Sequence, residues 1–225
     1  MNDLGIIVQM FKVLFSLCWQ SFCYTYSFRQ YWKHSQWGLS HCDGCQSSLK
    51  WWMKIPILSF LLLRGRCANC GCSLSIVGFL LEVLALISGI LWCFSSISLI
   101  EYASLMWVFH LIAMQDAYSE RIDGWKLMVL SEMAFIFHPW NFDSLQGGMA
   151  CGLILLAQVL DSKWIGDGDV WLIGIFVFIL SMEWIHLWLV FSSGTAILFA
   201  LWTKQRRIPF GPWLILSGWL LLILG

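Results

Sequence analysis

Long apolar segments separated by short polar ones occupy most of this 225-residue chain. A helix that crosses a membrane needs about 20 largely apolar residues, and several of these segments are shorter. The pattern predicts an all-α polytopic membrane protein with about eight transmembrane helices. It leaves counts of six and seven open, because two pairs of segments nearly join at 94/97 and at 182/184. The segments are residues 4–26, 74–94, 97–115, 125–138, 144–160, 170–182, 184–202 and 211–224.

Composition also indicates a chain that lies in the lipid bilayer. Hydrophobic residues make up 60% of it and charged residues 12%, against about 25% charged in a typical soluble domain. Sixteen tryptophans fit anchoring at membrane interfaces better than one soluble core. A formal net charge of zero argues against nucleic-acid binding through overall charge. Asp3 stands where a signal peptide is basic, so we expect the first segment to be retained as a membrane helix.

The basic residues fall on one side of the predicted topology. With eight helices, that side receives the loops 27–73, 116–124, 161–169 and 203–210. Because Lys and Arg are enriched in cytoplasmic loops, this side is predicted to face the cytoplasm, with the N-terminus outside. The opposite loops hold no Lys or Arg, and Lys12 lies inside the first segment. The cytoplasmic set is Arg29, Lys33, Lys50, Lys54, Arg64, Arg66, Arg121, Lys126, Lys163, Lys204, Arg206 and Arg207.

The loop 27–73 is too small to fold around an apolar core of its own. It carries two CxxC pairs, separated by 21 residues. Four thiolates at this spacing can close a tetrahedral zinc site, and bound metal would fold the loop. Disulfides are disfavoured in the reducing cytoplasm. We therefore expect one membrane domain over residues 1–225 with a cytoplasmic zinc loop inside it, whose ligands are Cys42, Cys45, Cys67 and Cys70.

Other interpretations of the cysteines stay open. The four can be ordinary reduced thiols, Cys72 can take the place of Cys70, and His41 is a minor candidate ligand. The remaining cysteines lie in apolar segments and are predicted to be packing residues; they are Cys18, Cys23, Cys93 and Cys151.

Two aspartates stand where apolar segments meet polar loops. Asp116 follows the segment 97–115, and Asp169 ends a GxGD sequence whose glycines are Gly166 and Gly168. Carboxylates at a bilayer boundary are costly, so each is a functional-site hypothesis. Two of them suggest an aspartyl dyad that hydrolyses peptides, in which one carboxyl holds a proton near neutral pH. Such a pair titrates as a unit, so the sequence does not assign the two roles.

Several ordered blocks of the sequence match one known family. Ser21–Arg29 resembles that family's GSFLNVVIYR helix end, and Ile55–Cys67 is close to its NIPVLSWLLLRGRC. Leu81–Leu84 resembles its LVELL, and Ile208–Pro212 matches its near-terminal IPFGP. With both CxxC pairs and the GxGD sequence among these blocks, the chain resembles the bacterial type IV prepilin leader peptidases, which are membrane-embedded GxGD aspartyl proteases.

The resemblance implies that Asp116 and Asp169 are the catalytic pair. It implies an inner-membrane enzyme that cuts type IV prepilins or pseudopilins on the cytoplasmic side, after the glycine that ends a short basic leader. Many relatives also methylate the new N-terminus with S-adenosylmethionine. No Gly-rich nucleotide sequence supports that second activity in this chain, so S-adenosylmethionine is implied by the resemblance alone. The GxGD glycines are expected to allow close backbone approach and conformations closed to other residues.

The chain departs from the family pattern at some positions. Asp123-Gly124 replaces the family's Pro-Asp, and Trp171 replaces the lysine that often follows GxGDV. Asp167 is an alternative partner to Asp169, while Glu120, Asp123 and Asp161 are expected to be solvated loop acids. Glu82, inside an apolar segment, is expected either to be structural or to shape the substrate groove. The helix-end histidines His110, His138 and His186 are expected to be packing or interface residues.

Three other functions compete with this one. A preflagellin-type or signal-peptide-type GxGD protease is disfavoured by the long CxxC loop. A non-catalytic membrane platform with a structural zinc loop would leave Asp116 and Asp169 as helix-end charges. A proton-coupled transporter lacks support, because Glu82 and Glu132 are the only acids well inside an apolar segment.

Overall fold

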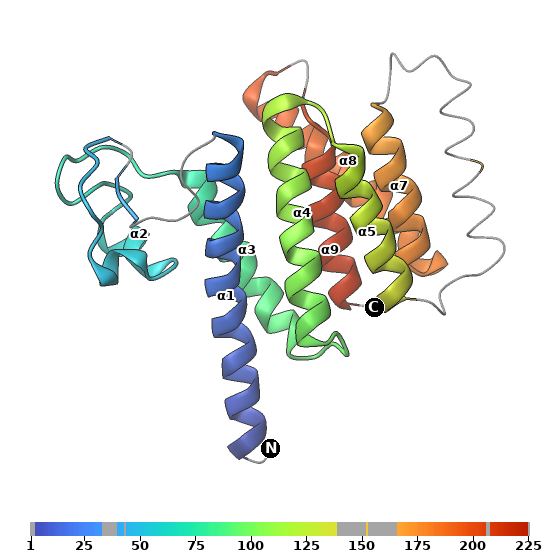
Figure 1. Cartoon of the computed structure of the whole chain (residues 1–225), viewed down its shortest axis with the longest axis horizontal. Helices are drawn as coiled ribbons and strands as arrows, with labels where there is room; N and C mark the ends of the chain where they lie inside the picture. Colours follow the sequence, from blue (N-terminus) through green and yellow to red (C-terminus); the bar gives the residue numbers. More distant parts are fainter. Residues whose placement is uncertain are drawn as a thin grey trace. The chain divides into compact units, whose positions relative to one another are not determined.

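The computed structural model describes residues 3–32, 40–42, 44–138, 152, 166–205 and 208–224. Within these residues the chain is helical, and its only β-structure is two isolated bridges, His41 with Ser48 and Arg66 with Ser73. The chain divides into two compact units, Met1–Ser96 and Ile97–Gly225 (Figure 1). The all-α prediction is therefore confirmed for the described residues.

The first unit is built on two long helices, α1 (Asp3–Tyr31) and α3 (Ile76–Trp92). They run antiparallel, because Ser16 Oγ donates to the main-chain oxygen of Ala85 at 2.7 Å while Lys12 Nζ donates to that of Trp92 at 2.9 Å. The helices pack closely where a Cβ at Gly89 would lie 2.9 Å from the Cβ of Ser16. The outer faces carry exposed apolar side chains, as a lipid-facing helix does.

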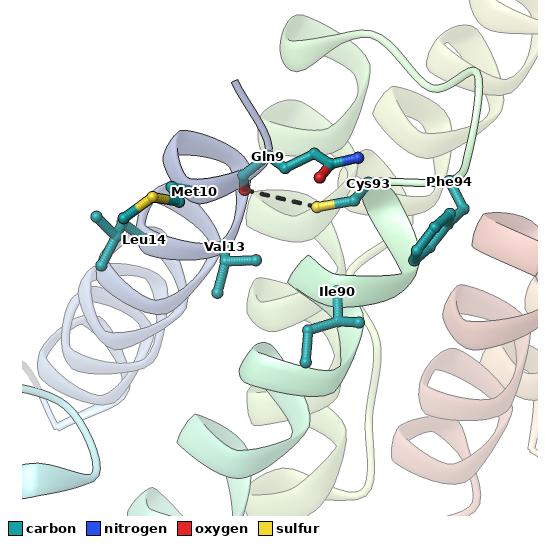
Figure 2. A pocket seen from close by; sticks show the side chains of 7 residues that line it. All are labelled: Gln9, Met10, Val13, Leu14, Ile90, Cys93 and Phe94. Atoms are coloured by element: carbon teal, nitrogen blue, oxygen red, sulfur yellow. Dashed lines mark hydrogen bonds between the residues drawn. The ribbon is translucent and has the colours of Figure 1, made fainter. Parts of the chain in front are cut away.

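One end of this helix pair encloses an apolar hollow of about 390 Å³ (Figure 2). Cys93 Sγ reaches across it to the main-chain oxygen of Gln9, at 3.5 Å. No acid, histidine or basic residue lines the hollow, so it carries no acid–base chemistry of its own. Its lining residues are Gln9, Met10, Val13, Leu14, Ile90, Cys93 and Phe94.

Between α1 and α3 the chain forms the cysteine loop. It contains a 3₁₀ turn, η1 (Trp51–Lys54), and the short helix α2 (Leu58–Leu62). The ring of Phe60 stacks on that of Phe79 with centroids 4.3 Å apart, which fixes α2 against α3.

In its described residues the second unit has five helices, of which α9 (Gly211–Leu224) is the central one in its contacts. It packs against α4, α7 and α8, and most of its side chains are buried. Figure 1 shows α9 alongside α4 within this unit. The other helices are α4 (Leu99–Ser119), α5 (Gly124–Phe137), α7 (Asp167–Ile179) and α8 (Met182–Thr203).

Aromatic side chains fill the middle of this unit. Phe176 of α7 lies between Phe109 of α4 and Trp188 of α8, with ring centroids 5.5 and 5.0 Å away. Trp219 of α9 contacts Tyr102 and Phe109 of α4 at 4.9 and 5.7 Å. Trp188 also donates its indole N–H to the main-chain oxygen of Leu214, at 2.9 Å. These contacts hold the beginning of α9 in place, and the candidate active site depends on that position.

Seven of the predicted apolar segments coincide with described helices, while the segment 144–160 lies outside the described residues apart from Gly152. At each of the two uncertain junctions the structure has two separate helices, with breaks at residues 93–98 and at 180–181. By length and apolarity, two described helices could cross a membrane, Leu4–Tyr31 and Glu183–Thr203, while Ile76–Trp92 and Gly211–Leu224 are apolar but shorter.

Candidate active site and metal centre

Asp116 lies in the last turn of α4, and its side chain is buried, with 6% exposed. The helix ends because Glu120 adopts a left-handed conformation (φ 50°) while donating its N–H to the main-chain oxygen of Asp116 at 2.9 Å. The carboxylate Oδ2 accepts a hydrogen bond from the main-chain N–H of Gly211, also at 2.9 Å. Asp116 is therefore held in a fixed position by the beginning of a distant helix.

Asp169 lies in the first turn of α7, where the partial positive charge of a helix N-terminus favours an acid. Its N–H donates to the main-chain oxygen of Gly166 at 3.0 Å. Its carboxyl Oδ1 is buried and has no hydrogen-bond partner among the residues that the structure describes. A buried carboxyl without a donor is costly in the ionised form.

The two carboxyl groups interact electrostatically. Both lie just outside the apolar segments 97–115 and 170–182. Burial, and to a lesser extent the negative charge of Asp116, raise the pKa of Asp169 to about 7. Burial also raises the pKa of Asp116, and the hydrogen bond from Gly211 opposes that rise. The structure thus brings the two sequence-predicted aspartates into one site, and their catalytic role stays a prediction.

The two GxGD glycines differ in what they do. A Cβ at Gly168 would lie 3.0 Å from both Cβ and Cδ1 of Ile122, so glycine allows the loop before α5 to touch α7. A Cβ at Gly166 would meet only Asp169 Oδ2, at 3.5 Å, which is ordinary contact. Gly166 has φ −66°, a conformation open to any residue, so the expected need for an unusual conformation is wrong there. Close approach is the relevant property, and it applies to Gly168.

A polar network joins the end of α4 to the loop before α5 and to Lys126. Gln115 Oε1 accepts hydrogen bonds from the main-chain N–H of Asp123 at 3.2 Å and from Lys126 Nζ at 2.7 Å. Lys126 Nζ also lies 3.6 Å from Asp123 Oδ2. Lys126 is 7% exposed, so a residue that the sequence marks only as a cytoplasmic charge is in fact a buried structural cation.

The other acids are sorted by exposure. Glu120 and Asp123 are exposed, as expected of solvated loop acids, and Asp161 lies outside the described residues. Asp167, the alternative partner to Asp169, is also exposed. Glu82 Oε2 accepts the main-chain N–H of Ile57 at 2.6 Å, which gives this acid a structural contact with the cysteine loop. That contact favours the structural alternative for Glu82.

The helix-end histidines differ from one another. His138 Nε2 lies 3.2 Å from Glu101 Oε1, at the opposite end of α4 and α5 from Asp116. Sequence reasoning missed this pair, because 37 residues separate the partners. His110 bonds through Nδ1 to the main-chain oxygen of Met106 at 2.7 Å, and His186 is exposed.

The structure gathers the two CxxC pairs into one cluster. The sulfur atoms of Cys42, Cys45, Cys67 and Cys70 all lie within 4.8 Å of one another. The four are free thiols in the structure. Four sulfurs at this separation can hold a metal ion, so the predicted ligand set is brought together as a group.

Each CxxC pair sits on the same kind of turn. Cys42 N–H donates to Ser47 O at 3.0 Å, and Cys67 N–H donates to Cys72 O at 2.8 Å. The residue after each pair has positive φ, 56° at Gln46 and 71° at Gly71. Main-chain N–H groups within these turns lower the pKa of Cys42 and of Cys67, which favours the thiolate forms that bind metals.

The alternative cysteine ligands are also placed. Cys72 Sγ lies 3.3 Å from Cys42 Sγ, so this fifth thiol contacts the cluster without replacing Cys70 in it. His41 is exposed and does not belong to the group. Cys23 is buried as a packing residue, and Cys93 bonds to main-chain oxygens within the α1–α3 pair, whereas Cys18 is exposed.

Gly211 is the functional candidate that sequence reasoning passed over. It belongs to the Ile208–Pro212 block, which the sequence identifies only as a family match. A Cβ there would lie 2.7 Å from Asp116 Oδ2, so only glycine leaves room for this approach. The only feature of the sequence that pointed to Gly211 was its place at the start of an apolar helix. That feature does not identify Asp116, 95 residues earlier, as its partner.

Comparison with known proteins places the chain in a family. Residues 14–97 match the bacterial peptidase A24 N-terminal domain. The chain is 30% identical to the prepilin leader peptidase/N-methyltransferase of Neisseria gonorrhoeae, over 81% of this chain and 70% of that protein. It is 28% identical to the protein of that name from Legionella pneumophila and 27% identical to that from Stutzerimonas stutzeri, each over 83% of this chain and 72% of the relative. No solved structure matches. The chain therefore belongs to the prepilin leader peptidase/N-methyltransferase family.

Proposed function

We propose that the chain is an aspartic endopeptidase that removes the short basic leader from type IV prepilins or pseudopilins, with Asp116 and Asp169 as its catalytic pair. The observation that supports this proposal is that two carboxyl groups from separate helices lie near enough for the charge of Asp116 to raise the pKa of Asp169. The substrate class comes from the relatives, whose name specifies prepilin leaders.

The chemistry of such a pair is peptide hydrolysis by an activated water. One ionised aspartate takes a proton from water, whose oxygen attacks the carbonyl carbon of the scissile bond. The protonated partner donates to the carbonyl oxygen, where negative charge develops. A pKa near neutrality at one member keeps both protonation states available at the pH of the cytoplasm.

The proposed location is the bacterial inner membrane, with the dyad facing the cytoplasm. Positive charge on one set of loops supports this orientation. Exposed apolar side chains on α1 and α8 support contact with lipid. In this proposal residues 1–225 form one peptidase domain with about eight membrane crossings, and the loop 27–73 is cytoplasmic. A pilin helix lying in the bilayer would present its cytoplasmic end, where the leader begins, to the dyad.

The proposed metal of the cysteine cluster is structural zinc. Tetrahedral Zn–S bonds of about 2.3 Å separate sulfur atoms by about 3.8 Å. The Cys42 and Cys70 sulfurs lie 3.8 Å apart, so the donor set fits that geometry. Zinc would hold together the two turns that carry the CxxC pairs, and its binding would favour the folded loop.

The relatives' names also include N-methyltransferase activity. We extend this activity to the present chain as the second part of the proposal, with S-adenosylmethionine as the methyl donor. Its measurement is separate from that of cleavage. The mass of the released pilin N-terminus would rise by one methyl group when S-adenosylmethionine is added.

The test is prepilin processing in membranes that contain the full chain. A prepilin or pseudopilin is co-expressed with wild-type protein, Asp116→Asn or Asp169→Asn, and its size is followed by electrophoresis. Asparagine keeps the shape of the side chain and removes the carboxyl group, so each substitution should reduce cleavage at least about a thousandfold. Asp167→Asn is the matched control, because this exposed neighbour should leave cleavage unchanged.

Wild-type cleavage that is lost in both dyad variants and kept in the control would support the proposal. Processing that survives both dyad substitutions would contradict it. The aspartates would then be helix-end charges, and a non-catalytic assembly platform would become the better description.

A further inference from the structure

The structure treats the two aspartates unequally. Asp116 has a main-chain donor, whereas the buried Oδ1 of Asp169 has none among the described residues. We infer that the Gly211 N–H fixes their roles, so that Asp116 is the ionised base and Asp169 is the protonated acid. This inference rests on the proposed function and adds an assignment that the sequence does not contain.

The first support is the origin of the hydrogen bond. Gly211 opens α9, and the first N–H groups of a helix have no partner within the helix. The Gly211 N–H is therefore free to donate to Asp116 Oδ2, at 2.9 Å in a buried setting. The positive end of the α9 dipole lies at the same point. Both effects stabilise a negative charge on Asp116.

The second support is steric. A Cβ on residue 211 would lie 2.7 Å from Asp116 Oδ2, closer than real Cβ atoms come, and 3.1 Å from Cγ, a tight contact. The chain therefore brings its backbone against the carboxylate at a position where any side chain would push the two apart. Trp188, bonded to Leu214 at 2.9 Å, keeps the first turn of α9 from moving away.

The third support is the opposite environment of Asp169. A buried oxygen without a donor favours the protonated carboxyl, which carries no charge. The α7 N-terminus favours ionisation, yet burial outweighs it, since the pKa of Asp169 rises to about 7. An ionised Asp116 strengthens this preference, because a second negative charge beside it is disfavoured.

Other charged groups near the pair are few in the described part of the chain. α9 carries no titratable side chain. Glu120, at the end of α4, raises the pKa of Asp116. α5 contributes Lys126, which is bonded to Gln115 and lies near Asp123, and α7 contributes the exposed Asp167. None of these supplies Asp169 with a hydrogen bond.

With these roles the reaction balances. Asp116 takes one proton from water as the water oxygen bonds to the carbonyl carbon, and Asp169 gives its proton to the carbonyl oxygen. The tetrahedral diol then collapses as Asp116 returns its proton to the amide nitrogen and the C–N bond breaks. Asp169 regains a proton from one hydroxyl as the C=O bond re-forms. The products are a carboxylic acid and an amine, and both aspartates regain their first states.

One test uses the pH profile of cleavage by the purified full chain. Gly211→Ala should reduce kcat/KM at least tenfold and move the acidic limb of the profile up by about one pH unit. The reason is that the added Cβ pushes the main-chain N–H of residue 211 away from Asp116, so the base loses its hydrogen-bond donor. The basic limb, which reports Asp169, should stay in place. Gly124→Ala is the control, since a Cβ there meets nothing within 4 Å. Loss of activity that is equal at every pH would show a merely structural role and overturn the inference.

A second test does not depend on activity. Infrared difference spectra at neutral pH compare wild type with Asp116→Asn and Asp169→Asn, and follow the C=O band of protonated carboxyl groups. The band should be lost in Asp169→Asn and kept in Asp116→Asn, and the reverse would overturn the assignment. If both variants fail to cleave while the bands are reversed, only the assignment is wrong. If both variants still cleave, the proposed function itself is wrong.

Discussion

At the scale of single residues, burial of Asp169 links the proposed chemistry to stability. Its pKa is raised from 3.8 to about 7. Between these values the folded chain holds a proton that the unfolded chain has released, so the free energy of unfolding falls as pH rises through this window. We expect Asp169→Asn to remove that fall and to raise the thermal midpoint at about pH 8 but not at about pH 4.

The measurement is thermal unfolding of the detergent-solubilised chain across this pH range. Asp167→Asn is the control, because its side chain is exposed and should leave the pH dependence as in wild type. A thermal midpoint that rises between pH 4 and 7 in wild type, and rises equally in Asp169→Asn, would contradict the buried, donor-free environment of this carboxyl.

A second residue-scale prediction concerns the contact of Gly168 with Ile122. Gly168→Ala would place a Cβ 3.0 Å from two carbon atoms of Ile122, and overpacking of this kind costs about 1–3 kcal/mol. We expect a lower thermal midpoint and weaker cleavage. Gly166→Ala should have a smaller effect, since its Cβ has ordinary contacts. Adding Ile122→Ala to Gly168→Ala should restore part of the loss, and an absence of any rescue would contradict this account.

At the scale of elements, the sequence predicted helices better than contacts. The period and length of the apolar segments were enough to predict seven helices, because the pattern that predicts a helix lies within the helix's own residues. The CxxC pairs likewise predicted their own cluster, since the ligand spacing is local within each pair. The Gly211–Asp116 bond joins residues 95 positions apart and depends on how α9 packs, which no local pattern contains. Such contacts required the structure.

The cysteine cluster gives an element-scale prediction. We expect purified protein to hold about one zinc ion per chain, and Cys42→Ser to lose it because three thiolates bind zinc far more weakly. The loop 40–73 should then become sensitive to added protease. Cys93→Ser is the control, because its sulfur bonds to main-chain oxygens of the α1–α3 pair and lies outside the cluster. Zinc content unchanged in Cys42→Ser would exclude this ligand set.

The attachment of this loop to α3 is a further element-scale prediction. Ile57 has φ 63°, an unusual conformation for a β-branched residue, and its N–H donates to Glu82 Oε2 at 2.6 Å. Glu82→Ala removes the acceptor and leaves the strain, so we expect faster proteolysis around residues 55–66. Ile57→Gly in the same background should slow proteolysis again, since glycine adopts this conformation freely. Equal proteolysis of Glu82→Ala and wild type would contradict the role of this bond.

At the scale of the whole molecule, the site constrains the path of the chain within the second unit. α5 leaves the dyad end of α4, where Lys126 bonds to Gln115, and ends where His138 meets Glu101 at the beginning of α4. α4 has 21 residues and is about 30 Å long, which is the thickness of a bilayer core. Asp169 is nevertheless back at the dyad end, because it interacts with Asp116. Residues 138 and 166 therefore lie at opposite ends of this unit.

The sequence pattern predicts that the apolar segment 144–160, which lies outside the described residues apart from Gly152, crosses the membrane. Topology reporters fused after Glu120, His138, Ile165 and Leu180 should then report cytoplasm, outside, cytoplasm and outside in turn. Reporters on the same side after His138 and Ile165 would mean that this segment does not cross. In that case, Asp116 and Asp169 would lie at opposite faces of the membrane. That result would contradict both the dyad and the count of about eight helices.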